Sequence, residues 1–506
     1  MADYELMDET NGMRYKYCWW RITVLVCVYL SITILVFFIW HRAYDSYGQT
    51  VNYLAFTNSE YATCMSISIT CIHFVIYCIV VFAKDVSIQL LEKATAYSAA
   101  FRNHGELSHD FRLVKPSTFR VKSLHSESDY DSLEEIEMRA PAPSKRLLVC
   151  YYSLPNADKY LNNLRLSNVN GSLCTHINVG MTYVQNFSIV IGKELNDVLQ
   201  NEVPKFRIQY PESKLLLWVG GGSSSSFGFV NMVKTHKTRK IFIQSLKYIL
   251  HTYQLNGCDL DWEFPSAYNR ERQHFSQLLY EIRAEYVREK RPYLLSVAVA
   301  APEGIAYFAY DVGEINKYAN HVNVMTYDYH FYTKSAPFTG LNAPLYARYN
   351  EFSILGTLNI NHSVNWWLLN GLERSKLVVG LPTYGHSYTL INAFNTGIGA
   401  PAKDVGRSGF AGFVAYSEIC WFKQNNLHVV EVYDQQTCSP YVDCGTEWIS
   451  FENSLSMQCK AEYIRNNQLG GAMLFSLNTD DFNGICNDQG SEHYPLTKIV
   501  ANVLQK

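Results

Sequence analysis

The sequence has no excess of either charge. Lys and Arg together number 43 and Asp and Glu number 46, which gives a formal net charge of −3 over 506 residues. Proteins that bind nucleic acid usually carry a basic excess, so we expect no nucleic-acid partner. The chain also lacks a GxGxxG or phosphate-binding loop between a strand and a helix, and its 15 His residues are scattered without ligand spacing. We therefore expect no nucleotide cofactor and no metal.

The overall amino-acid composition is that of a globular protein. Hydrophobic residues make up 48% of the chain and charged residues 18%, which excludes disorder and a collagen-like fibre. The length of 506 residues excludes a small disulfide scaffold. It allows two or three domains, or one large barrel with attachments.

Two long apolar runs lie near the N-terminus. Residues 22–40 carry no charged side chain, and these 19 residues are enough to cross a hydrocarbon core of about 30 Å as a helix. We expect a transmembrane helix there, in contact with membrane lipid, after an N-terminal tail at 1–21. A cleaved signal peptide is the alternative, but its apolar core would be shorter. Residues 65–83 are also uncharged and are a candidate for a second span, although polar residues dilute them.

The side of the membrane on which the rest of the chain lies is not decided by Lys and Arg, which flank the two runs almost equally. Eight of the 13 cysteines follow residue 83, together with Asn-x-Ser/Thr sequons at Asn170, Asn186 and Asn361. Both features favour an oxidising and glycosylating compartment. We expect a membrane protein whose large domain is extracellular or lumenal. With a single span the N-terminus is then cytoplasmic, and with two spans it lies on the same side as the large domain.

The region after the apolar runs divides into a tether and a large domain. Residues 84–145 become acidic in their later part and end in prolines, as a tether does. From residue 146 to 506, eight short apolar, β-rich runs alternate with segments long enough for helices: 146–153, 174–184, 214–221, 257–265, 294–302, 321–330, 376–388 and 470–477. Eight such repeats predict an α/β fold, a (β/α)8 TIM barrel. The last two runs are too far apart for one helix, which predicts a small α+β insertion at about 389–469.

The fourth run carries the chemistry. It contains Asp259, Asp261 and Glu263 at alternate positions, and side chains at alternate positions of a strand lie on the same face. We expect these three carboxyls to point into the barrel, with the intervening apolar residues facing the helices. Three like charges in an interior of low dielectric lower their energy by keeping protons. Glu263, nearest the carboxyl end where barrel active sites lie, is placed to hold a proton and give it to a leaving group.

At these residues the sequence resembles glycoside hydrolase family 18, the chitinases and chitinase-like lectins, whose fourth-strand signature is DGxDxDWE followed by an aromatic residue and Pro. Here the segment 256–265 is NGCDLDWEFP, and the motifs CYY at 150–152, MTYD at 325–328 and GLPTYG at 380–385 resemble the first, sixth and seventh strands. The resemblance covers nearly all of residues 146–506. It implies hydrolysis of β-linked N-acetylglucosamine polymers such as chitin, in which the acetamide oxygen of the substrate is the nucleophile.

The resemblance also implies roles for individual residues. Glu263 would be the general acid and then the base, Asp261 would orient the acetamide N–H, and Asp259 would share a proton with Asp261. Tyr327 would hydrogen-bond the acetamide oxygen. The residues expected to line the groove are Tyr151, Met325, Asp328, Tyr384, His386 and Phe475. Two disulfides are implied, Cys150 with Cys174 and Cys420 with Cys486. Cys258 is expected to be a buried thiol, and Cys438, Cys444 and Cys459 stay unassigned, although Cys438 with Cys444 would close a short loop.

Several positions depart from the family pattern. The first Asp of the signature is Asn256, the groove Trp after the first strand is replaced near Pro155, and the third strand carries Trp218-Val219-Gly220-Gly221-Gly222 in place of Ser-x-Gly-Gly-Trp. The eighth-strand Trp is Phe475, and the Arg expected after Tyr384-Gly385 is His386. Because sugar grooves grip by ring stacking, the loss of the three Trp residues predicts weaker binding along a long polymer, by about 1 kcal/mol or more at each affected subsite. The change to Asn256 leaves the three inner acids in place.

Two functions are therefore open. The first is a membrane-anchored glycosidase acting on N-acetylglucosamine polymers, and the retained acidic residues favour it. The second is a chitinase-like glycan-binding protein with little or no turnover, which the missing Trp residues favour. A barrel that serves only as a scaffold for protein partners has no positive support in the sequence.

Overall fold

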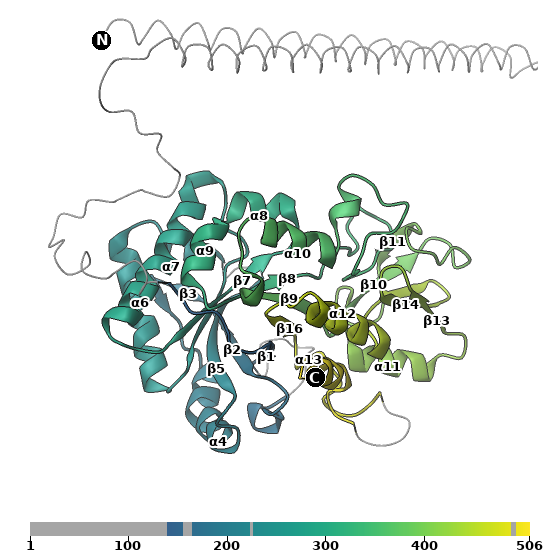
Figure 1. Ribbon diagram of the computed structural model, residues 1–506. Coiled ribbons are helices and arrows are strands. Elements are labelled where there is room, and N and C mark those ends of the chain that lie inside the picture. The colour runs from purple at the N-terminus through teal and green to yellow at the C-terminus, as the bar shows by residue number, and fades with distance from the viewer. Residues whose placement is uncertain (1–138, 155–163, 223–225, 487–491, 506) are drawn as a thin grey trace, which may run out of the picture. The chain divides into compact units, whose positions relative to one another are not determined.

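The computed structural model describes residues 139–154, 164–222, 226–486 and 492–505. Eight parallel strands close into a barrel in the order in which they occur along the chain, and the last pairs with the first (Figure 1). They are β1 (Leu147–Ser153), β2 (His176–Thr182), β5 (Lys214–Gly220), β6 (Gly257–Asp261), β7 (Leu294–Ala300), β8 (His321–Met325), β9 (Leu377–Pro382) and β16 (Gly471–Phe475). Each lies in one of the eight predicted runs, so the predicted TIM barrel is confirmed.

Helices surround the barrel. They are α3 (Lys193–Asp197), α4 (Val203–Gln209), α5 (Ser226–Met232), α6 (His236–Thr252), α7 (Glu271–Arg288), α8 (Glu303–Ala309), α9 (Val312–Tyr318), α10 (Ile360–Leu369), α12 (Ser454–Asn466) and α13 (Pro495–Leu504). Helix α6 illustrates why these segments are helical. A capping box formed by Thr235 and Thr238 starts it, and Phe242, Leu246 and Ile249 recur on its buried face.

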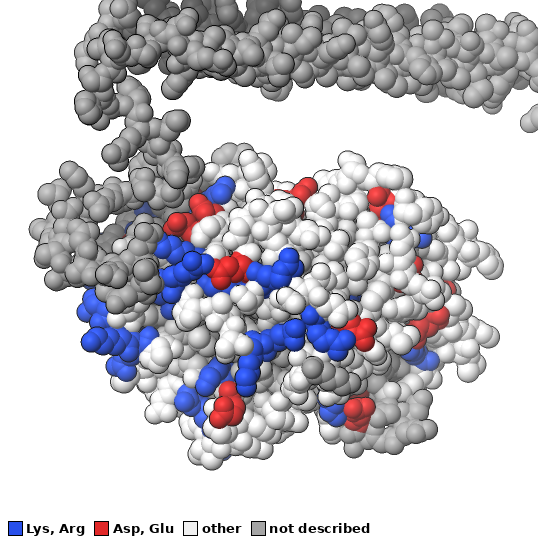
Figure 2. Space-filling model, viewed as in Figure 1, with Lys and Arg blue, Asp and Glu red and all other residues white. Residues whose placement is uncertain are grey.

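Short elements complete the barrel domain. Strands β3 (Val184–Gln185) and β4 (Ser188–Ile189) form a small hairpin after β2. Single turns of 3-10 helix occupy Leu166–Asn168, Tyr268–Arg270, Leu355–Thr357 and Arg374–Lys376, and a π-helix occupies Val198–Glu202. In the view of Figure 2, charged side chains gather over the barrel and its helices, whereas the face of the inserted sheet is mostly uncharged.

The insertion is an antiparallel sheet with one helix. Its elements are β10 (Tyr384–Leu390), β11 (Ala402–Val405), β12 (Phe413–Ala415), α11 (Tyr416–Asn425), β13 (Val430–Asp434), β14 (Ser439–Cys444) and β15 (Glu447–Ser450). It therefore runs from about 384 to 450, whereas the spacing suggested 389–469. The start was misplaced because β10 follows β9 after one residue and both are rich in β-forming side chains. The end was misplaced because α12 contacts β16 and α13 and so belongs to the barrel.

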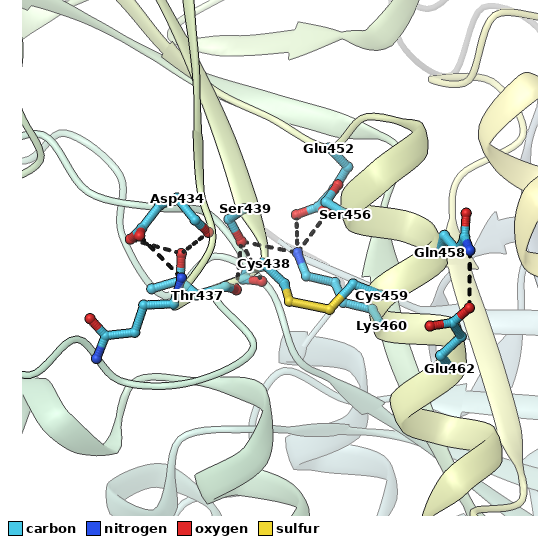
Figure 3. Close-up of a disulfide and its surroundings, with 12 residues drawn as sticks. Asp434, Thr437, Cys438, Ser439, Glu452, Ser456, Gln458, Cys459, Lys460 and Glu462 are labelled. Carbon is cyan, nitrogen blue, oxygen red and sulfur yellow. Dashed lines mark hydrogen bonds and ion pairs between the residues drawn. A yellow bond between two sulfur atoms is a disulfide. The ribbon is translucent and has the colours of Figure 1, made fainter.

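Three disulfides join segments of the domain. The two implied pairs, Cys150–Cys174 and Cys420–Cys486, are both present, and Cys258 is a buried free thiol. The third disulfide joins Cys438 to Cys459, so the short loop closure of Cys438 with Cys444 was wrong. Figure 3 shows that this bond ties the segment before β14 to helix α12.

The barrel domain begins earlier than residue 146. Ala140 is buried, its N–H donates to the carbonyl of Lys317, and its own carbonyl accepts from Nζ of Lys376. Within the described residues no helix is both long and apolar enough to cross a bilayer. The two expected spans at 22–40 and 65–83, the tail at 1–21 and nearly all of the tether at 84–145 lie outside the described residues.

Candidate active site

The three acids predicted on the fourth barrel strand lie at its carboxyl end. Asp259 and Asp261 belong to β6 and have exposed fractions of 0% and 3%, and Glu263 lies two residues after the end of the strand and is half-buried. The residue between the last two acids faces outward as expected. The ring of Trp262 stacks on Phe229 at 5.5 Å and meets Phe275 edge-on at 5.8 Å. The alternation predicted from the sequence therefore holds, with acids inside and apolar side chains against the helices.

Asp259, the deepest acid, accepts three hydrogen bonds. The donors are the Tyr151 hydroxyl at 2.5 Å, the Ser296 hydroxyl at 2.6 Å and Nδ2 of Asn323 at 3.0 Å. Burial raises the pKa of Asp259, and these three donors oppose that rise because they favour the ionised form. Charge-assisted hydrogen bonds of this kind stabilise the carboxylate form of Asp259.

Asp261 is the more strongly perturbed acid of the pair. Its Oδ2 accepts a hydrogen bond of 2.9 Å from the indole N–H of Trp218, and its Oδ1 has no partner among the described residues. Burial, followed by repulsion from Glu263 and Asp259, raises the pKa of Asp261 well above its ordinary value. The ionised form of Asp261 is therefore disfavoured more strongly than that of Asp259, which has three donors.

Glu263 is poised to exchange a proton near neutral pH. Burial, and secondly the nearby charge of Asp328, raise the pKa of Glu263 to about 7. The backbone of Gly222 lies beside this carboxyl: a Cβ added there would be at ordinary contact distance, 3.8 Å, from Oε1 of Glu263. The arrangement suits a general acid that becomes a base after it has given up its proton.

An aromatic enclosure surrounds the acids. The ring of Phe475 lies at its centre, with ring centroids 5.6 Å from Tyr151, 5.9 Å from Trp218, 6.0 Å from Tyr327 and 6.1 Å from Tyr384. These rings come from five different barrel or insertion strands or the segments just after them. Burial, then repulsion from the acids, raises the pKa of Tyr327, so its hydroxyl stays protonated and able to donate.

Asp328 links the barrel to the inserted sheet. It accepts hydrogen bonds from the Tyr384 hydroxyl at 2.5 Å and from Nε2 of His386 at 2.7 Å, and its own side chain is 47% exposed. Met325 is half-buried at the carboxyl end of β8. His386, which stands where the family pattern has Arg, is thus a partner of a groove carboxylate.

A family comparison decides the identity of this domain. The model of the glycosyl hydrolases family 18 matches residues 147–480. The chain belongs to glycoside hydrolase family 18.

Relatives in family 18 include both catalysts and a binding protein. Mouse chitotriosidase-1 is 33% identical over 372 residues, which cover 71% of this chain and 78% of that protein. The structure of a Group IV chitinase from Ostrinia furnacalis is 30% identical, with a TM-score of 0.66 over 72% of this chain and 100% of the other. Human YKL-39, described as a pseudo-chitinase with retained chitooligosaccharide binding, is 29% identical, with a TM-score of 0.67 over 71% and 100% of the two chains.

The family-18 residues named from the sequence come together in one place. The residues expected to be catalytic (Asp259, Asp261, Glu263 and Tyr327) and those expected to line the groove (Tyr151, Met325, Asp328, Tyr384, His386 and Phe475) lie on barrel strands, just after the carboxyl ends of these strands, or on β10. Asn256, which replaces the first Asp of the signature, lies at the opposite end of β6, where its Oδ1 accepts from the backbone N–H of Leu215. That replacement leaves the inner acids untouched.

Sequence reasoning missed three residues that contact the acids. Trp218 bonds Asp261, and Ser296 and Asn323 bond Asp259. A signal was present for two of them. Ser296 is the only polar residue of the apolar strand β7, and Asn323 is one of two polar residues of β8. Both point into the barrel: Ser296 is in register with Asp259 of β6, and Asn323 is in register with Ala298 of β7.

The predicted glycosylation sites differ in exposure. Asn170 and Asn186 are exposed, the latter in the turn between β3 and β4. Asn361 is half-buried on α10, where its Oδ1 accepts a hydrogen bond of 3.0 Å from the Tyr463 hydroxyl. In the described part of the chain, no group of three or more His, Cys, Asp or Glu side chains is arranged to hold a metal ion.

Proposed function

We propose that the barrel hydrolyses β-1,4-linked N-acetylglucosamine polymers, chitin or chito-oligosaccharides, with retention at the anomeric carbon. The observation that carries this proposal is the set of three inward acids in which Glu263 has a pKa of about 7. A pure binding protein gains nothing from three carboxyls crowded in a buried site, whereas an acid and base catalyst needs a group that titrates near its working pH.

The geometry supports substrate-assisted catalysis. Glu263 gives its proton to the glycosidic oxygen while the acetamide oxygen of the substrate attacks the anomeric carbon and the glycosidic bond breaks. Asp261 holds the acetamide N–H and stabilises the positive charge of the oxazolinium ring, and the Tyr327 hydroxyl donates to the acetamide oxygen. Ionised Glu263 then takes a proton from a water molecule, whose oxygen attacks the anomeric carbon and opens the ring.

The second candidate is glycan binding with little or no turnover. One observation favours it: the centre of the aromatic enclosure is Phe475, where the family pattern has Trp, so the stacking surface beneath the sugar is smaller. The similar human YKL-39 is described as binding chitooligosaccharides as a pseudo-chitinase, which shows that this family accommodates the loss of turnover.

We also propose that the protein is anchored in a membrane by residues 22–40, with or without a second span at 65–83, and that the barrel lies on the extracellular or lumenal side. The disulfides support this proposal because they form and persist in oxidising compartments. A glycosidase mobility-shift assay on the full chain tests it at Asn170 and Asn186, which are exposed. A shift is expected. An unshifted chain would place the barrel in the cytoplasm and contradict the proposal.

Release of a chromophore from a chitobioside analogue tests the hydrolysis. We expect the wild type to release the chromophore. In Glu263→Gln the rate should fall by at least about 100-fold, which is the order expected for removal of a general acid. Glu194→Gln, an exposed Glu on α3, is the matched control and should keep full activity. Calorimetric titration with chitotetraose accompanies the assay. Binding without release in both the wild type and Glu263→Gln would establish the second candidate.

A further inference from the structure

A second polar cluster lies inside the barrel, on the first three residues of two opposite strands. His176 and Asn178 come from β2, and His321 and Asn323 come from β8. Asn178 pairs in register with Tyr151, whose hydroxyl reaches Asp259 inside the barrel, so Asn178 also points inward. The rings of His176 and His321 lie 5.3 Å apart, which places the two strands' side chains against one another across the interior.

Four polar atoms of this cluster have no hydrogen-bond partner among the described residues. They are Oδ1 and Nδ2 of Asn178, Oδ1 of Asn323 and Nε2 of His321. The exposed fractions of these side chains are 0%, 0% and 1%, so bulk water does not reach them. Buried polar groups are almost always hydrogen-bonded, and a buried water that bonds about three of them is the usual solution where the protein offers no partner.

We propose that this cluster is a buried water site, and that Asn178 is a positioning residue which acts through that water on Asn323 and hence on Asp259. Asn323 donates through Nδ2 to Asp259 at 3.0 Å and to the Tyr151 hydroxyl at 3.4 Å, while its Oδ1 is buried and has no partner among the described residues. A water that bridges Asn178 to this Oδ1 fixes the amide so that its N–H groups stay on Asp259. The functional part of this inference rests on the proposed hydrolysis, and the water site itself does not.

The two histidines of the site are neutral, and the charged groups near it are the acids and Lys214. Burial lowers the pKa of His176 to about 4 and that of His321 well below its ordinary value, so both rings are neutral at pH 7. The titratable and charged groups that face Asp259 and the site are Asp261 and Tyr151 above, and His321, His176 and Lys214 below. Strand β7 contributes the hydroxyl of Ser296, and β9 contributes Val378, which is in register with Asn323.

A crystal structure of the full-length wild-type chain tests the water site directly, through the electron density inside the barrel. We expect density for at least one water within hydrogen-bond distance of Asn178 and of Asn323 or His321. Empty density there, or an amide of Asn178 bonded directly to Asn323, would overturn the proposal. This result does not depend on whether the protein turns over substrate.

The pH dependence of kcat/KM tests the effect on Asp259. In Asn178→Leu the bridging water loses its main partner, Asn323 is released, and the ionised form of Asp259 loses a donor. The aspartate pair then takes its second proton at a higher pH, so the acidic limb should move upward by about one pH unit, the shift that corresponds to one hydrogen bond to a charged group. The basic limb, set by Glu263, should not move.

Two further variants separate this effect from simple loss of packing. Val378→Ala removes volume near the same level without changing a polar group, and Asn178→Ser keeps a hydroxyl and leaves room for water. Both should keep the acidic limb of the wild type. A uniform fall in rate at every pH in Asn178→Leu, or an equal shift in Val378→Ala, would overturn the positioning role. If Asn178→Leu does not fold, Asn178→Val replaces it. If the wild type shows no turnover, the proposed hydrolysis is contradicted. The water site is then tested by the electron density of the crystal structure alone.

Discussion

The indole N–H of Trp218 donates a hydrogen bond of 2.9 Å to Oδ2 of Asp261. The ring is held edge-on against Tyr151 at 4.9 Å and against Phe475 at 5.9 Å, so its donor cannot turn away. This contact occupies one carboxyl oxygen of Asp261 and leaves Oδ1 as the oxygen that a substrate amide would reach. A third-strand sequence that departs from the family pattern thus still supplies an indole to the site.

Substitution of Trp218 by Phe tests the importance of this contact. Removal of one hydrogen bond to a charged or charge-developing group costs about 1.5–3 kcal/mol, so we expect kcat to fall by about 10-fold to 100-fold, with a smaller change in KM. Trp262→Phe is the matched control, because that ring lies on the outer face beside the same acids and packs against Phe229. It should lower stability and leave kcat within about twofold. Equal losses of kcat in the two variants would contradict the role of Trp218.

The raised pKa of Glu263 predicts the basic limb of the pH profile. Glu263 must be protonated to act as the acid, and its pKa of about 7 means that kcat/KM should fall as pH rises through neutrality. Repulsion from Asp328 contributes to that pKa, so Asp328→Asn should move the basic limb to lower pH. Initial rates across pH 4–10, with ~pH 7 as the expected midpoint, check both statements. A limb that stays in place in Asp328→Asn would show that burial alone raises the pKa.

The disulfide between Cys438 and Cys459 should stabilise the domain. It closes a sequence separation of 21 residues, for which restriction of the unfolded chain corresponds to about 3 kcal/mol. We expect the double variant Cys438→Ala, Cys459→Ala to lower the free energy of unfolding in urea by about 2–4 kcal/mol. Cys444→Ser, at a cysteine free of disulfide bonding, is the control and should change it little. If Cys444→Ser lowers the free energy of unfolding as much as the double variant does, the disulfide does not stabilise the domain as predicted.

A buried ion pair lies beside that disulfide. Nζ of Lys460 contacts both carboxyl oxygens of Glu452, and the two side chains are 0% and 1% exposed (Figure 3). Burial lowers the pKa of Lys460 and raises that of Glu452, and each partner's charge opposes the shift of the other. Lys460→Met leaves a buried carboxyl without its counter-ion and should cost about 3–5 kcal/mol in urea unfolding.

The double variant Lys460→Met, Glu452→Leu removes both charges together. It should recover most of the stability that Lys460→Met loses, since an apolar pair of similar volume avoids the desolvation of two ions. A double variant no more stable than the single one would mean that the loss in Lys460→Met does not come from an unpaired Glu452, but from other contacts of Lys460 such as that with Ser439.

The amino-acid sequence determined the features that depend on local pattern. Alternation along a strand placed Asp259, Asp261 and Glu263 on one face and Trp262 on the other, because side chains of an extended chain alternate whatever surrounds them. Eight apolar runs, separated by segments long enough for helices, predicted the eight strands of the barrel. The boundary between β9 and β10 could not be predicted in this way, since only Thr383 separates the two strands.

Tertiary structure decided what depends on neighbours brought together by closure of the barrel. The indole of Trp218 meets Asp261, the amide of Asn323 meets Asp259, and the thiol of Cys438 meets Cys459 only because the strands and helices that carry them are packed side by side. No local period encodes these contacts. Likewise, the order of the three acids along the chain points to Glu263 as the proton donor. Its pKa, however, is set by its burial and by the charge of Asp328, and both of these influences arise only in the folded site.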